Sequence, residues 1–400
     1  MFSSRLPREL PPNDLARAVA NLRAAGTSLL DLTATNPTAV DIPYPSGVLS
    51  SLADPLAERY EPDPHGVPAA RRAVAAEFQR QGAPIPADRI VLTASTSEAY
   101  ALLFKLLCDA GDDVLIPQPS YPLFEWLTRL DNVSARPYRL EYHGRWSIDR
   151  QDLERALTPR TRAVLVVSPN NPTGARLDDD DRDWLVEVCQ ARGLAMIADE
   201  VFADYPQAVG SGRSAWGLGL GPTGGSILAG ESRVLTFSLG GLSKSAGLPQ
   251  VKLGWIGVSG PEDLVGDAIE RLGVIGDTYL SVSTPVQVAA PRLIEAGREI
   301  RIAIQARLEL NLAALRAAIG GHPSVALLDP EAGWSAVLRV PAVESEEQLV
   351  LRLLRDAHVL VHPGYFFDFA HEAFVVVSLL PEPAAFAEGI GRLLTIASRR

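Results

Sequence analysis

Residues 163–174 read AVLVVSPNNPTG, an uninterrupted run of five apolar residues followed at once by a polar segment. An apolar run of this length without polar alternation is typical of a strand that is buried on both faces of a parallel sheet. The Asn, Pro and Gly residues that follow it favour a turn. Similar units recur on both sides of this stretch, so it decides the predicted fold class.

Short apolar runs alternate with amphipathic stretches from about residue 46 to about residue 280. We predict strands at 89–94, 113–116, 163–167, 194–198 and 234–237, and helices at 97–107, 123–130 and 180–191. This alternation predicts an α/β fold with a mostly parallel sheet sandwiched by helices. Ligands of such sheets bind beyond the carboxyl ends of the strands, so the loops after the strands form the expected site.

The two ends of the chain have different patterns. Residues 1–45 are rich in proline and turn formers and predict an N-terminal arm with one short helix. Residues 46–285 form the predicted large domain. Residues 286–400 form a predicted connecting helix and a small C-terminal domain, with strands at 335–340 and 374–379 and helices at 345–357 and 384–398. We therefore expect a smaller α+β domain built from the C-terminal part and the N-terminal arm.

The composition argues against several classes of protein. Of the 400 residues, 47% are hydrophobic and 21% are charged, which is ordinary for a soluble globular protein. The formal net charge of -11 argues against nucleic acid and anionic membrane surfaces as partners. The N-terminus has no apolar run typical of a signal peptide, and the apolar stretches are too short to span a membrane. Cys108 and Cys189 have no metal or redox spacing, so we expect free thiols, no metal site and a cytoplasmic protein.

Lys244 is the central candidate for chemistry. It ends the segment GLSK (241–244), just beyond a predicted strand, where a parallel sheet displays ligands. A partly desolvated lysine has a lowered pKa and attacks carbonyl carbons. A lysine taken alone is more often a surface residue, so its neighbours decide the interpretation.

Three other predicted strands also end in polar residues. Asp199 can pair with a cation or keep a pyridine nitrogen protonated. Asn171 can have a purely structural role in a turn, or it can donate a hydrogen bond to a phenolate oxygen. Ser95 and Thr96 precede a predicted helix. Their hydroxyls and the N-terminal N–H groups of that helix can bind phosphate, or these residues can serve only as a helix cap.

Together, these segments resemble the class I/II aminotransferase family, the fold-type I enzymes that use pyridoxal 5'-phosphate (PLP). The resemblance runs from about residue 36 to the C-terminus and is strongest in NNPTG (170–174), DEVF (199–202) and SLGGLSK (238–244) followed by LGW (253–255). It implies that Lys244 forms a Schiff base with PLP and then moves protons. It also implies that Asp199 pairs with the ring nitrogen and that Asn171 bonds the ring hydroxyl.

The resemblance assigns further contacts to the cofactor and the substrate. Ser95, Thr96 and Ser238 are implied to bind the phosphate, and Tyr121 to stack on the ring. Tyr60 resembles a tyrosine that reaches the phosphate in the partner subunit, which implies a homodimer with a shared active site. Asn36 resembles a residue near the substrate carboxylate.

Three positions depart from the family pattern. Phe202 replaces a tyrosine that bonds the ring oxygen, which should raise the pKa of the Schiff base, and Tyr205 is an alternative donor. Lys252 replaces an arginine that binds the phosphate, so the charge is kept without the bidentate fork. Val376 lies where the family has its substrate arginine, although a buried carboxylate without a cation is unfavourable. The candidates for replacing that arginine are Arg339 and His362.

The leading functional prediction is a PLP-dependent aminotransferase that moves an amino group from an amino acid to a 2-oxo acid. A PLP lyase or cyclase of the same fold is the alternative, because the same carbanion can eliminate a β-substituent. A PLP-binding regulator without turnover is the third interpretation. Such regulators carry an N-terminal DNA-binding domain, for which the arm of about 45 residues is too short and not basic enough.

Overall fold

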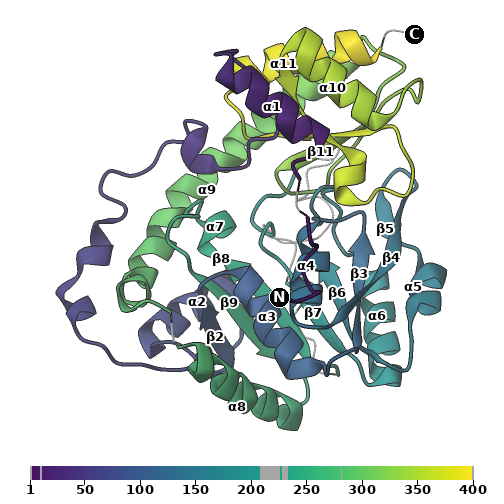
Figure 1. The fold of residues 1–400 in the computed structure, drawn as a ribbon. Helices are drawn as coiled ribbons and strands as arrows, with labels where there is room; N and C mark the ends of the chain where they lie inside the picture. The colour runs from purple at the N-terminus through teal and green to yellow at the C-terminus, as the bar shows by residue number, and fades with distance from the viewer. Residues whose placement is uncertain (1, 10, 208–225, 228–232, 281, 399–400) are drawn as a thin grey trace.

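The structure is a computed structural model that describes residues 2–9, 11–207, 226–227, 233–280 and 282–398. It has two parts, each built around its own sheet. The long helix α9 (Thr284–Ile319) runs from one part to the other (Figure 1).

The larger part contains an eight-stranded sheet with the strand order β2-β9-β8-β7-β6-β3-β4-β5. The strands from β8 to β4 are parallel, whereas the β2–β9, β9–β8 and β4–β5 pairs are antiparallel. The predicted mostly parallel sheet is therefore confirmed. The strands are β2 (Ile90–Thr93), β3 (Asp113–Gln118), β4 (Ser134–Tyr142), β5 (Trp146–Ile148), β6 (Thr161–Val167), β7 (Ala195–Asp199), β8 (Thr236–Gly241) and β9 (Gly254–Ser259).

Helices cover both faces of this sheet (Figure 1). Along β6, Ala163, Leu165 and Val167 pack in the core beneath α3 and α8, while Val164 and Val166 pack against α6 on the other face. Burial on both sides explains why this strand is continuously apolar. The helices of the larger part are α2 (Pro68–Arg80), α3 (Thr96–Leu107), α4 (Leu123–Leu130), α5 (Arg150–Ala156), α6 (Asp179–Arg192), α7 (Leu242–Ser245) and α8 (Glu262–Tyr279).

The smaller part is α+β and includes the N-terminal arm, as predicted. Its four-stranded antiparallel sheet has the order β10-β11-β14-β13, and the arm strand β1 pairs in parallel with β12. Helix α1 lies beside α10 (Figure 1). The elements are α1 (Asp14–Ala24), β1 (Leu30–Asp31), β10 (Ala326–Leu328), β11 (Ser335–Arg339), α10 (Glu346–Ala357), β12 (Val359–Leu360), β13 (His362–Pro363), β14 (Phe374–Ser378) and α11 (Pro383–Ala397).

The two parts meet closely at the loop after β6. Gly174 has a φ of +71°, and a Cβ on this residue would lie 2.5 Å from the main-chain oxygen of Ala332. The Ala332 N–H donates to the Gly174 oxygen at 3.0 Å. Glycine is therefore needed where the NNPTG segment packs against the smaller part. No helix in the described ranges is both long and apolar enough to cross a membrane.

Candidate active site

A cavity of about 390 Å³ lies between the two parts, at the carboxyl ends of the central strands. Asp199 is the last residue of β7, Asn171 follows β6, and Lys244 lies in α7 directly after β8. The arm and the smaller part supply the opposite wall, which consists of Thr33, Thr35, Trp334, Ser335, His362, Phe366, Phe367, Val376 and Ser378.

Lys244 is partly buried, with its ammonium group over two aromatic rings. Its Nζ lies 4.6 Å from the ring centre of Trp334 and 5.5 Å from that of Phe202. Burial lowers the pKa of Lys244 from 10.5 to about 8, and the charge of Asp199 opposes this shift. A substantial neutral fraction is therefore present at mildly alkaline pH, and the neutral amine is the form that attacks a carbonyl carbon.

The carboxylate of Asp199 is buried beside two hydrogen-bond donors. The Tyr100 hydroxyl donates to Oδ2 at 2.7 Å, and the Val201 N–H donates to Oδ1 at 3.2 Å. Burial raises the pKa of Asp199, while both hydrogen bonds and the charge of Lys244 oppose the increase. The site thus presents an acceptor that a cationic group in the cavity would stabilise.

Helix α3 begins at the cavity wall. Thr96 and Ser97 line the cavity, and Ser95 caps the helix by accepting the Glu98 N–H with its Oγ at 3.1 Å. The first N–H groups of a helix have no partner inside it, and they favour anions. A Cβ on Gly254 of β9 would lie 3.1 Å from the Thr96 nitrogen, so a glycine is required where the strand approaches this helix start.

The family of the chain follows from a comparison with known protein families. The model for aminotransferase class I and II matches residues 52–387. The chain belongs to this family. The predicted PLP-dependent aminotransferase is therefore confirmed at the level of family, reaction type and cofactor.

Individual aminotransferases resemble the chain over nearly its whole length. An alanine aminotransferase of Mycobacterium tuberculosis is 28% identical over 94% of this chain and 86% of its own length. A glutamate–pyruvate aminotransferase of Escherichia coli is 26% identical over 87% of this chain and 85% of its own length. The structure of an alanine aminotransferase from Pyrococcus furiosus has a TM-score of 0.84 at 23% identity, covering 97% of this chain and 96% of the other.

The groups in the cavity of this aminotransferase fit PLP. Lys244 could supply an amine to the aldehyde, Asp199 has a buried carboxylate that would suit the pyridine nitrogen, and the start of α3 has N–H groups that would suit the phosphate. The cavity wall brings together these residues named from the sequence: Thr96, Tyr121, Asn171, Asp199, Phe202, Lys244, His362 and Val376.

Ser238 requires a correction. It lies within β8, is 1% exposed and does not line the cavity. Its hydroxyl donates to Glu200, which also accepts the Ser226 hydroxyl at 2.6 Å and the Ile227 N–H at 2.7 Å. Because this hydroxyl is bound to a buried carboxylate of the sheet, the predicted contact with the cofactor phosphate is not supported.

Two substrate candidates also need correction. The exposed Asn36 caps a short helical turn by accepting the Thr38 N–H at 3.1 Å, and it is not part of the wall. Arg339 is exposed at the far end of β11, four residues beyond Ser335, which does line the cavity. At about 3.3 Å per residue, that separation is about 13 Å. Neither side chain lies where a substrate in the cavity would bind.

Three further candidates lie outside the wall. Tyr205 is buried, and its hydroxyl donates to the main-chain oxygen of Lys244 at 2.5 Å, so it is not an alternative donor to the cofactor ring. Lys252 is exposed, with a φ of +62°, two residues before Gly254. Tyr60 is 64% exposed, and its predicted contact in the partner subunit stays a prediction.

Several residues of the site were not identified from the sequence. Tyr100 lies four residues after Thr96, on the same face of α3, and this spacing is a signal that was available. The remaining ones come mostly from the arm and the smaller part, where no motif marks them. They are Thr33, Thr35, Ser97, Leu123, Phe124, Val167, Val201, Trp334, Ser335, Phe366, Phe367 and Ser378.

Proposed function

We propose that this aminotransferase acts on amino acids with uncharged side chains and that His362, not an arginine, holds the substrate carboxylate. One observation carries this proposal. Among the described residues of the cavity wall, only Lys244 and His362 can carry a positive charge. Lys244 is taken up by the cofactor, so one cationic group remains for one carboxylate. A second carboxylate on the substrate side chain would be buried without a partner.

The position of His362 supports this role. It lies on β13 directly opposite Val376 of β14, the position that holds an arginine in the family pattern. Its ring stacks on Phe366 at 5.0 Å and makes no hydrogen bond with another described residue. Burial lowers the pKa of His362, and Asp31 opposes this. A bound carboxylate would raise that pKa, so binding should take up a proton and strengthen as the pH falls.

We assign roles to the remaining residues of the cavity as well. Bound PLP supplies an electron sink that acidifies the α-proton of the substrate. Lys244 Nζ takes this proton and returns it, and Asp199 keeps a proton on the pyridine nitrogen. The first turn of α3 would hold the phosphate, Asn171 would donate to the ring hydroxyl, and Tyr121 would cover the ring. The walls of Phe202, Trp334, Phe366 and Phe367 exclude water.

We also propose a homodimer in the cytoplasm. Leu56, Tyr60, Val274 and Leu280 are all more than half exposed. The end of α8 lies against residues 64–66, so these apolar side chains belong to neighbouring segments that a second copy would cover. The free thiols of Cys108 and Cys189 support a reducing compartment. Sedimentation of the holoenzyme tests the dimer, and a monomer with full activity would refute the shared site.

Steady-state kinetics with matched histidine variants test the carboxylate site. His362→Gln should raise KM about 10–100-fold for alanine, because a charge-assisted hydrogen bond contributes about 1.5–3 kcal/mol. In the wild type, KM should fall as the pH is lowered toward the pKa of His362, and the variant should lose this dependence. The control is His143→Gln, since His143 is exposed in the turn between β4 and β5 and does not line the cavity. An unchanged KM in His362→Gln, or a preference for aspartate over alanine, would overturn the proposal.

Half-reactions separate transamination from elimination. With an amino donor and no acceptor, the cofactor should convert to its amine form in one turnover without release of ammonia. Continuous ammonia release from serine or cysteine would instead identify a lyase. Lys244→Ala should abolish the attachment of PLP by borohydride, and attachment that survives in this variant would show that another amine holds the cofactor.

A further inference from the structure

The turn that carries Lys244 is held from behind by side chains of distant segments. Helix α7 has only four residues, Leu242–Ser245, so its carbonyl groups have few partners inside the helix. The Tyr205 hydroxyl donates to the main-chain oxygen of Lys244 at 2.5 Å, and the Arg301 guanidinium donates to that of Ser245 at 2.9 Å. Two adjacent carbonyls are thereby fixed by two parts of the chain.

The long helix α9 approaches α7 closely because glycines leave room. A Cβ on Gly297 would collide with the Cβ of Ala246. A Cβ on Gly247 would lie 2.8 Å from Cγ2 of Ile300. Arg301 lies one turn after Gly297 on the same face of α9. This packing therefore brings the guanidinium of Arg301 to the end of α7.

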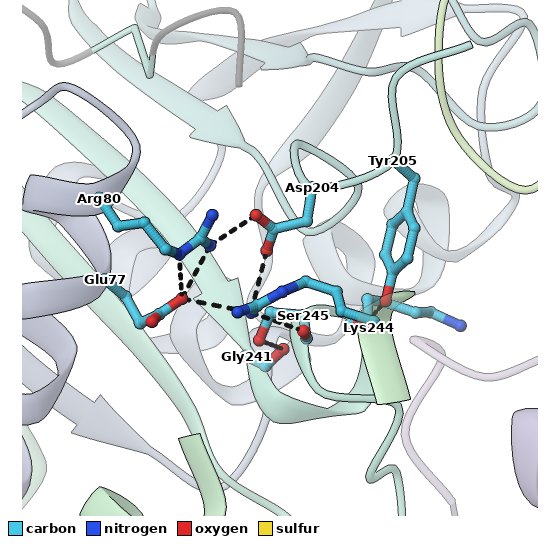
Figure 2. Close-up of polar contacts among 8 residues, drawn as sticks. Glu77, Arg80, Asp204, Tyr205, Gly241, Lys244 and Ser245 are labelled. Carbon is cyan, nitrogen blue, oxygen red and sulfur yellow. Dashed lines mark hydrogen bonds and ion pairs between the residues drawn. The ribbon is translucent and has the colours of Figure 1, made fainter. Parts of the chain in front are cut away.

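Arg301 belongs to a ring of four charged side chains. Arg301 pairs with Glu77 at 3.3 Å and with Asp204 at 3.6 Å. Arg80 pairs with the same carboxylates at 2.8 and 2.5 Å (Figure 2). Two positive and two negative charges balance, which allows the side chain of Asp204 to be 2% exposed. Since Asp204 precedes Tyr205 in the chain, the ring also restrains the Tyr205 backbone.

We propose that Tyr205 and Arg301 are positioning residues that fix the direction in which Lys244 enters the cavity. At the α7 turn, both side chains contact only main-chain oxygens. The Lys244 amine points away from the ion pairs, as Figure 2 shows, toward the rings of Trp334 and Phe202. Tyr205 also follows Asp199 by six residues, so its hydrogen bond ties together the two segments that hold the cofactor. The proposal rests on the assigned role of Lys244.

Tyr205→Phe removes only the hydroxyl and keeps the ring packing on Trp334, whose centre is 5.1 Å away. We expect kcat to fall about 10–100-fold with KM little changed, because a small misplacement of a reacting group has effects of this size. The PLP-free protein should attach added PLP more slowly. Hydrogen exchange should accelerate at the Gly247 amide, which donates to the Lys244 oxygen at 3.2 Å.

The matched control is Tyr138→Phe. Tyr138 is 1% exposed, and its hydroxyl donates to the main-chain oxygen of Leu165 at 3.0 Å, away from the cavity wall. This variant loses the same kind of buried hydrogen bond, so its thermal stability should fall comparably. Its kcat and its rate of PLP attachment should stay at the wild-type values. Equal kcat and attachment rates in the two tyrosine variants would overturn the positioning role.

A second pair of variants tests Arg301 without unbalancing the ring. Arg301→Lys keeps the charge but lacks the planar fork that reaches both the carboxylates and the Ser245 carbonyl. Arg307→Lys is the control, because Arg307 is on the same helix and donates to the main-chain oxygens of Val40 and Leu380. Only Arg301→Lys should lower kcat and slow PLP attachment, and equal effects would refute the proposal. Lys244→Ala, which should lose attachment altogether, tests the assigned role of Lys244 separately.

Discussion

Replacing Lys244 with methionine should stabilise the PLP-free protein below pH 8, and the gain should disappear at higher pH. Burial lowers the pKa of Lys244 from 10.5 to about 8, so the folded protein binds this proton more weakly than the unfolded chain does. A difference of about 2.5 in pKa corresponds to about 3 kcal/mol. Below pH 8 both states are protonated and the folded state carries the whole penalty. Between pH 8 and 10.5 the stability of the wild type rises, and the penalty fades.

The aromatic rings beside Lys244 reduce the expected gain. Its Nζ lies 4.6 Å from the Trp334 ring centre and 5.5 Å from that of Phe202. A desolvated cation over such rings is stabilised by about 1–2 kcal/mol. Methionine also packs well against aromatic rings. We therefore expect a net increase of about 1–3 kcal/mol in the free energy of unfolding at pH 7.

Urea unfolding of the PLP-free proteins at pH 7 and pH 9.5 measures this effect. The cofactor must be absent, because its binding would add stability to the wild type. Lys105→Met is the control, since Lys105 pairs with Asp131 near the surface and should show no gain. Lys105, Lys244 and Lys252 are the only lysines in the sequence, so NMR of ¹³C-methylated lysines also reports the pKa directly. A less stable Lys244→Met protein at pH 7, or a difference that does not shrink at pH 9.5, would refute the reasoning.

Three other substitutions give distinct expectations. Tyr100→Phe removes a donor from Asp199, which should raise the pKa of that carboxyl group further and weaken PLP binding in a fluorescence titration; unchanged affinity would contradict this. Phe202→Tyr should add a donor to the cofactor ring oxygen and lower the pKa of the Schiff base in an absorbance titration, and a pKa that rises would count against it. Ser238→Ala should lower the thermal stability by removing a donor to Glu200, while PLP affinity stays unchanged. A clear loss of PLP affinity in that variant would restore Ser238 as a phosphate ligand.

The central residues of the site could be predicted because they follow strands. Asn171, Asp199 and Lys244 each come directly after an apolar run, and the carboxyl ends of parallel strands meet at one edge of the sheet. Local sequence therefore places them together once the fold class is known. The exact bounds of a strand matter less. The strand before Lys244 was predicted to begin at residue 234 and begins at Thr236, yet Lys244 still lies at the site.

The direction of individual side chains was harder to predict. Ser238 and Tyr205 both lie close in sequence to cofactor residues, yet one binds Glu200 and the other the backbone of Lys244. Successive side chains of a strand point to opposite faces, so a position near the motif does not decide which group the Ser238 hydroxyl meets. Tyr205 lies in the irregular segment after β7, where the tertiary packing decides the direction of the side chain.

The sequence by itself predicted a PLP-dependent aminotransferase with Lys244 and Asp199 at the centre of its site. That information is local, because each residue is marked by its own strand and turn. Only the tertiary structure decided which wall faces them. In the tertiary structure, Arg339 and Asn36 lie outside the cavity wall. His362 lies opposite Val376 because two strands of the smaller part pair with each other. The tertiary structure also brought Arg301 of α9 behind Lys244, a contact that depends on the packing of two helices and has no sequence motif.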